Sequence, residues 1–122
     1  MVELMQLLTA QFRAVTPEAY HTYNRSLTVT YPYLTYDIDG EYVERNVEGF
    51  YIDVDIFDHN TSYERVFALE QAVKDHFKDL NIMTDDVFIR FKFNGSSKID
   101  TLDESIVRRN VRFYAKTDWR KK

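Results

Sequence analysis

The most specific chemistry in this chain would come from a short acidic cluster. Asp53 and Asp55 are one residue apart, and Asp58 and His59 follow closely. Alternate residues of a strand share a face, and carboxylate oxygens are preferred Mg²⁺ ligands, so a metal-dependent hydrolase is one function this spacing allows. The alternative is a solvated sheet face on which basic residues of another strand neutralise the carboxylates. We favour this ion-pairing interpretation and predict no catalytic residue, no bound metal and no cofactor.

A second set of side chains is basic and alternates with aromatic residues on two predicted strands. Nucleic-acid-binding modules use such interleaving of cations and rings. The outer face of an ordinary sheet, partly neutralised by nearby carboxylates, has the same pattern. Both interpretations stay open at this point. The set consists of Arg90, Lys92, Arg108, Arg109, Arg112 and Lys116.

The composition indicates a single domain over residues 1–122, with a short basic tail at 117–122. The chain is 44% hydrophobic and 16% aromatic, which is enough apolar surface for a core of its own. It contains no cysteine, which excludes disulfides and thiolate metal sites. No apolar run reaches membrane length and no basic region precedes the first apolar residues, so we expect no membrane contact and folding in a cytoplasm.

The charge is divided unevenly along the chain. Residues 1–61 contain 3 basic and 10 acidic side chains, whereas residues 62–122 contain 13 basic and 10 acidic ones. A chain with one acidic half and one basic half could pair with copies of itself or with a polyanion.

The acidic cluster belongs to a strand that leads directly into a helix. Residues 50–57 alternate between apolar and polar, which predicts a strand with one buried face. From there to Leu80 the apolar residues recur at helical spacing, and Phe67, Val73 and Phe77 are expected to pack on the sheet. The remaining expected elements are a helix over 2–14, a strand over 27–38, a turn at Asp39-Gly40 with a projecting return arm over 41–47, a strand over 87–93, a long loop over 94–104 and a strand over 106–116.

This order, α-β-β-α-β-β, predicts an α+β fold. Placing the fourth strand between the second and third gives the order 1-2-4-3 with every neighbour antiparallel, and sets Asp53 and Asp55 across from Arg108 and Arg112. We therefore expect a two-layer sandwich, in which two helices cover one face of a four-stranded, mainly antiparallel sheet.

In this element order the chain resembles the tail terminator proteins of long-tailed bacteriophages, also called tail-to-head joining or tail completion proteins. The likeness is carried by Pro32-Tyr33, by the strand Val54–Asp58 and by the helix that follows, and it covers roughly residues 2–116. The resemblance implies a structural virion protein of a phage or prophage and no enzyme.

The resemblance also implies partners and a location. It implies a homo-oligomeric ring, usually a hexamer, that caps the tail tube protein, contacts the head-tail connector protein and lets DNA pass through its lumen without specific binding. It places the protein in the virion tail, assembled in the cytoplasm of the bacterial host. Another neck or minor tail protein, a nucleic-acid-binding module and a metal-dependent hydrolase remain the alternatives. The expected subunit-interface residues are Asp39, Glu41, Glu44, Arg45, Asn94, Lys98, Asp103, Arg108, Arg109 and Arg112.

Overall fold

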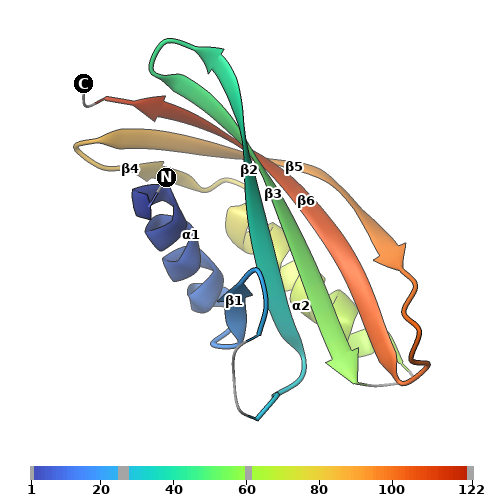
Figure 1. The fold of residues 1–122 in the computed structure, drawn as a ribbon. Coiled ribbons are helices and arrows are strands. Elements are labelled where there is room, and N and C mark those ends of the chain that lie inside the picture. The colour runs from blue at the N-terminus through green and yellow to red at the C-terminus, as the bar shows by residue number, and fades with distance from the viewer. Residues whose placement is uncertain (1, 25–27, 60–61, 121–122) are drawn as a thin grey trace.

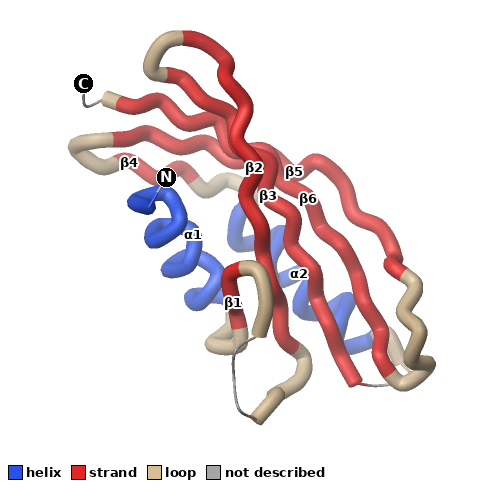
Figure 2. The backbone as a smooth tube through the Cα atoms, viewed as in Figure 1, coloured by secondary structure: helices blue, strands red, loops and turns tan. Residues whose placement is uncertain are grey.

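A single six-stranded sheet, in the order β1-β2-β3-β6-β5-β4, organises the molecule. The structure is a computed structural model that describes residues 2–24, 28–59 and 62–120, and both helices lie on one side of the sheet (Figures 1 and 2). None of the helices in this described part is long and apolar enough to cross a membrane. The elements are α1 (Val2–Val15), β1 (Ala19–His21), β2 (Tyr33–Glu44), β3 (Val47–His59), α2 (Glu64–Phe77), β4 (Asn81–Met83), β5 (Val87–Ile99) and β6 (Ile106–Trp119).

The predicted fold class, a sandwich with a four-stranded antiparallel sheet, is wrong. The sheet has six strands, it is mixed because β1 runs parallel to β2, and it curls around the helices as a half-barrel (Figure 1). The two additional strands, β1 and β4, have three residues each and are too short to show a two-residue period. The four long strands do lie in the predicted order, β2-β3-β6-β5, and each is antiparallel to its neighbours.

The core lies between the inner face of the sheet and the two helices. Alternation along β3 buries Phe50, Ile52, Val54 and Ile56, as the sequence predicts. The helix α1 adds Leu4, Leu8 and Phe12, which recur every four residues and are fully buried, and the Phe12 ring stacks on Tyr36 of β2 at 4.6 Å.

The helix α2 contributes a narrower stripe than expected. Phe77 is buried and its ring lies 4.9 Å from Phe12, 5.0 Å from Phe91 and 5.2 Å from Phe113. The prediction that Phe67 packs in the core is wrong, because its side chain is 49% exposed. On the face that turns to the sheet, the helix buries Glu70 instead.

The predicted turn at Asp39-Gly40 is also wrong. The strand β2 continues to Glu44, and the chain reverses at Arg45 and Asn46, where Asn46 has φ 65°. Gly40 lies within the strand opposite Phe50, and a Cβ there would make an ordinary contact with the Phe50 ring at 3.4 Å. The β2–β3 hairpin still projects from one end of the sheet, past the N-terminal end of α1 (Figure 1).

Most of the predicted loop over 94–104 is strand. The strand β5 continues to Ile99 after a bulge between Phe93 and Gly95, where Gly95 has φ 122°. A bulge inserts one extra residue into a strand without ending it. The polar residues after the bulge therefore still pair with β6. Their polarity is explained by partners on that strand, described below.

The ends of two further elements differ from expectation. The first predicted strand begins at Tyr33, directly after Pro32, and its expected start at residue 27 lies outside the described residues. The expected tail at 117–122 begins within β6, which continues to Trp119, and residues 121–122 also lie outside the described part.

Candidate subunit interface

The expected interface residues fall into three groups, at the two edges and in the centre of the sheet. Asp39, Glu41 and Glu44 lie on β2, and Arg45 lies in the turn after it. Asn94 and Lys98 lie on β5 at the other side of the four long strands, and Asp103 lies in the connection to β6. Arg108, Arg109 and Arg112 lie on β6 in the middle. The structure therefore places the expected interface residues in three separate parts of the molecule and does not join them into one patch.

Arg109 lies on the inner face and its partners belong to its own chain. Its guanidinium donates to Glu70 of α2 at 2.8 Å and to Ser96 of β5 at 3.2 Å. The guanidinium also lies 5.1 Å from the ring of Phe67, and the Arg109 side chain is only 17% exposed. Lys74 forms a further ion pair with Glu70 at 3.5 Å. These contacts join α2 to the sheet, so Arg109 stabilises the fold of the subunit.

The expected pairing of acidic and basic strands is confirmed on the outer face. Asp53 lies directly opposite Arg112 in the register of β3 and β6. Asp55 lies opposite Asn110, which donates to it at 3.1 Å, and it pairs diagonally with Arg108 at 3.1 Å. This network neutralises the centre of the outer face.

Arg112 continues the network toward β5. It donates to Asn110 at 2.7 Å and to Ser97 at 3.1 Å, so a polar chain crosses three strands. Ser97 follows the bulge in β5, which explains why a serine-rich segment belongs to a strand.

The acidic cluster that suggested a metal site is divided between the two faces. Asp53 and Asp55 point outward, whereas Asp58 points inward, where it is fully buried and accepts two bonds from Arg65 at 2.9 and 2.5 Å. Among the described residues, no group of three or more His, Asp or Glu side chains is placed to hold a metal ion.

A cluster of rings on the outer face was not predicted. The rings of Tyr33 and Phe57 stack at 4.9 Å, Tyr31 lies 5.5 Å from Tyr33, and Arg108 lies over Phe57 at 5.1 Å. Burial raises the pKa of the Tyr33 phenol, and the neighbouring Tyr31 adds to this rise while Arg108 opposes it. The sequence Tyr31-Pro32-Tyr33 at the start of β2 could have indicated this cluster, because alternate residues of an extended chain share a face.

A second aromatic contact anchors the β2–β3 hairpin. The hydroxyls of Tyr51 and Tyr114 donate to Glu41 at 3.4 and 3.3 Å. Gly49 makes this possible, because a Cβ there would occupy the position of the Tyr114 hydroxyl. Burial of the phenol, followed by the charge of Glu41, raises the pKa of Tyr114. Glu41 thus holds the arm in place.

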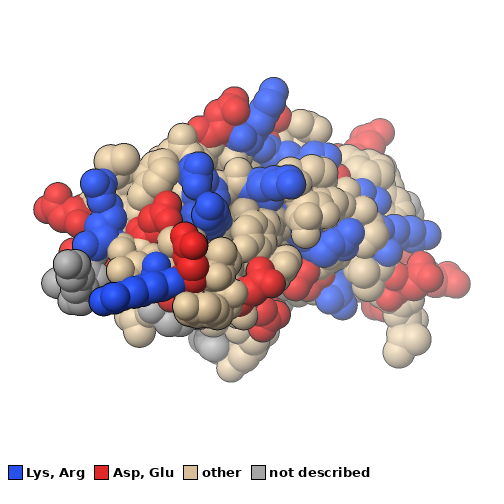
Figure 3. Space-filling view, turned by 90° about the horizontal axis from the view of Figure 1, so that it is seen from above, with Lys and Arg blue, Asp and Glu red and all other residues tan. Residues whose placement is uncertain are grey.

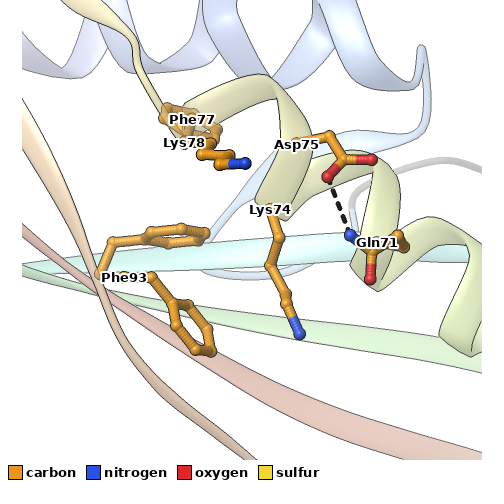
Figure 4. Close-up of a pocket in the computed structure, with 7 residues that line it drawn as sticks. Gln71, Lys74, Asp75, Phe77, Lys78 and Phe93 are labelled. Atoms are coloured by element: carbon orange, nitrogen blue, oxygen red, sulfur yellow. Dashed lines mark hydrogen bonds between the residues drawn. The ribbon is translucent and has the colours of Figure 1, made fainter.

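A pocket of about 290 Å³ opens between α2 and the sheet (Figure 4). The rings of Phe77, Phe93 and Phe113 form its apolar side, and Lys74 reaches from the helix toward the sheet, 4.9 Å from the Phe93 ring. Asp75 is occupied by a hydrogen bond from Gln71 at 2.8 Å. The pocket lacks a constellation of nucleophile and base, and its shape indicates a shallow surface hollow.

The basic residues are divided between the two faces of the sheet. Arg109 points inward and Arg108 is paired with Asp55, which leaves Arg90, Lys92, Arg112 and Lys116 on the outer face of β5 and β6. At the end of the molecule seen in Figure 3, Lys and Arg side chains are interspersed with Asp and Glu. This arrangement gives little support to a nucleic-acid-binding module, which needs a single-sign groove.

The fold is similar to that of a solved virion protein. One chain in a structure titled "Virion of native gene transfer agent (GTA) particle" matches with a TM-score of 0.63 and 13% sequence identity, covering 88% of this chain and 84% of that one. The present chain thus has a fold that occurs in a virion subunit. No family model matches the sequence, and no curated protein matches it either.

Proposed function

We propose that this protein is a structural subunit of a phage-type virion, and specifically the terminator that caps the tail tube as a ring and joins it to the head connector. The observation that carries the proposal is the fold likeness to a chain of the gene transfer agent virion over 88% of the present chain. The sequence resemblance to tail terminators supports the finer assignment.

The form of the molecule supports a structural role. The carboxylates of the acidic cluster form ion pairs within the chain, as Asp55 does with Arg108 and Asp58 does with Arg65. Of the expected interface residues, those on β2 and those on β5 lie on opposite sides of the four long strands, as head-to-tail contacts between identical subunits require. In this proposal the ring is a hexamer in the assembled tail, and the free subunit is monomeric or weakly associated.

The test is deletion of the gene in the phage or prophage that encodes the chain. We expect tails that fail to join heads and tubes of irregular length, both visible by negative-stain electron microscopy and both corrected by a plasmid copy. Purified protein added to isolated tubes should appear as a ring at one tube end. Tails of normal length joined to heads after deletion would contradict the terminator assignment, and density at another position in the virion would favour a different neck or minor tail protein.

A further inference from the structure

Two strands of the sheet have long edges that no described strand covers. β1 pairs with β2 only at Leu34–Tyr36, and β4 pairs with β5 only at Phe88–Arg90. Residues 37–44 of β2 and 91–99 of β5 therefore present an open backbone edge within the described part of the chain (Figure 1). Such an edge is a template for pairing with another strand. We call these segments the β2 free edge and the β5 free edge.

The two free edges carry charges of opposite sign. The β5 free edge bears Lys92 and Lys98 and no Asp or Glu. The side chains of Asp39 and Lys92 are exposed, and among the described residues neither has an ion-pair partner. The β2 free edge bears only acidic charges, at Asp37, Asp39, Glu41 and Glu44.

Two like charges also face each other at the β2 free edge. Asp37 lies directly opposite Asp53. Like charges at such positions oppose strand pairing. Bringing the basic edge of another copy beside Asp37 would reduce this repulsion.

We propose that the β2 free edge of one copy pairs with the β5 free edge of the next, so that the sheet continues from subunit to subunit. The contact is made where the two edges lie at the same height along the strands, with residues 37–40 of one copy beside residues 91–95 of the next. The inference deepens the proposed function and rests on it for the existence of a ring. The four long strands alternate in direction, so β2 and β5 run opposite to each other. Copies related by rotation about an axis along the strands then meet with β2 antiparallel to β5, which continues the alternation.

The charges also select against the wrong pairings. Charged side chains on an edge strand normally prevent pairing with any partner. Here two β2 edges repel each other and two β5 edges repel each other, whereas the mixed pair attracts. The contact is therefore head-to-tail, the kind that closes into a ring.

Cross-linking of purified protein tests the contact directly, because the natural chain contains no cysteine. Asp39→Cys and Lys92→Cys are prepared as separate single variants, mixed at high concentration and treated with a flexible bismaleimide. We expect the mixed dimer as the main product. The control pair is Lys92→Cys with Asp79→Cys, an exposed residue that follows α2. Mixed product no greater than in the control pair, or mainly like-with-like product, would overturn the inference.

A charge exchange provides the second test. By sedimentation equilibrium at high concentration, Asp39→Lys and Lys92→Glu should each weaken self-association about tenfold, and their equimolar mixture should recover it, because every contact in an alternating ring is again complementary. Asp79→Lys is the matched control, and all variants should keep the wild-type unfolding midpoint. Equal association of all forms would overturn the inference. A ring seen on tubes without the mixed cross-link leaves the proposed function standing, and a mixed cross-link with normal tails after gene deletion removes only the terminator role.

Discussion

Arg109 and Glu70 form an ion pair at 2.8 Å on the inner face of the sheet, and this contact joins α2 to β6. Both side chains are largely buried, so each carries a charge that the other must compensate. The pair fixes the helix over the sheet at a position where the apolar stripe of α2 is interrupted.

Reversing the charge at this position should therefore destabilise the subunit. In Arg109→Glu two carboxylates meet in a buried place, and we expect a loss of about 3–5 kcal/mol in the free energy of unfolding, measured by urea titration followed by circular dichroism. Arg108→Glu is the matched control, because Arg108 lies on the outer face and its pair is more exposed; its cost should stay near ~1 kcal/mol. Equal losses in the two variants would show that the inner pair has no special role.

Phe77 should be the most sensitive position of α2. Its ring contacts three other buried or half-buried rings, so Phe77→Ala should cost about 3–5 kcal/mol in the free energy of unfolding. Phe67→Ala removes the same atoms from a half-exposed site on the same helix and should cost much less. The prediction fails if the two variants unfold at the same urea concentration.

Stability should fall at high pH, partly because of Tyr36. Burial raises the pKa of this phenol, while its hydrogen bond with Thr9 and the charge of Arg13 oppose the rise. Above pH ~10 the unfolded phenol loses its proton while the folded one keeps it, so the free energy of unfolding decreases as pH rises.

Urea unfolding between pH 8 and 11 measures this dependence. Tyr36→Phe should flatten the decline but not abolish it, because the pKa values of Tyr33 and Tyr114 are also raised. Tyr42→Phe, which alters a largely exposed ring, should retain the wild-type decline. A wild-type slope in Tyr36→Phe would contradict the assignment.

The protein should bind no divalent metal tightly. Asp55 is engaged by Arg108 and Asn110, and Asp58 lies on the opposite face with Arg65. Calorimetric titration with Mg²⁺, Mn²⁺ and Zn²⁺ should show no binding tighter than about millimolar. Micromolar affinity that disappears in Asp53→Ala would revive the hydrolase.

Periodicity in the sequence was enough to predict the long elements. The alternation of residues 50–57 identified the inner face of β3, and the antiparallel order of the four long strands followed from the position of the helix. Short strands carry no such signal. β1 and β4 exist because backbone groups at the ends of β2 and β5 find partners there, and that depends on tertiary structure.

The turn predicted at Asp39-Gly40 and the loop predicted over 94–104 were wrong, because both glycines lie within strands. Gly40 lies within β2 opposite Phe50, and Gly95, with its positive φ, allows the bulge in β5. The alternation along β6 places Arg109 on the same face as Val107 and Val111, which is the inner face. Its buried partner Glu70 could not be predicted, because that contact depends on how α2 lies over the sheet. The expected interface residues were chosen mainly by charge, and the structure distributes them over β2, β5 and the central strand β6.

The position of β6 has a consequence for synthesis of the protein. This last strand lies in the centre of the sheet. It pairs with β3 on one side, from the partners Val47 and Asp118 to the partners His59 and Ile106, and it pairs with β5 on the other side. A nascent chain that has been made only as far as residue 105 therefore holds two separate half-sheets with facing apolar strands and no strand between them. Folding of the sheet must await β6, and a chain made only as far as residue 105 exposes apolar strands that favour aggregation.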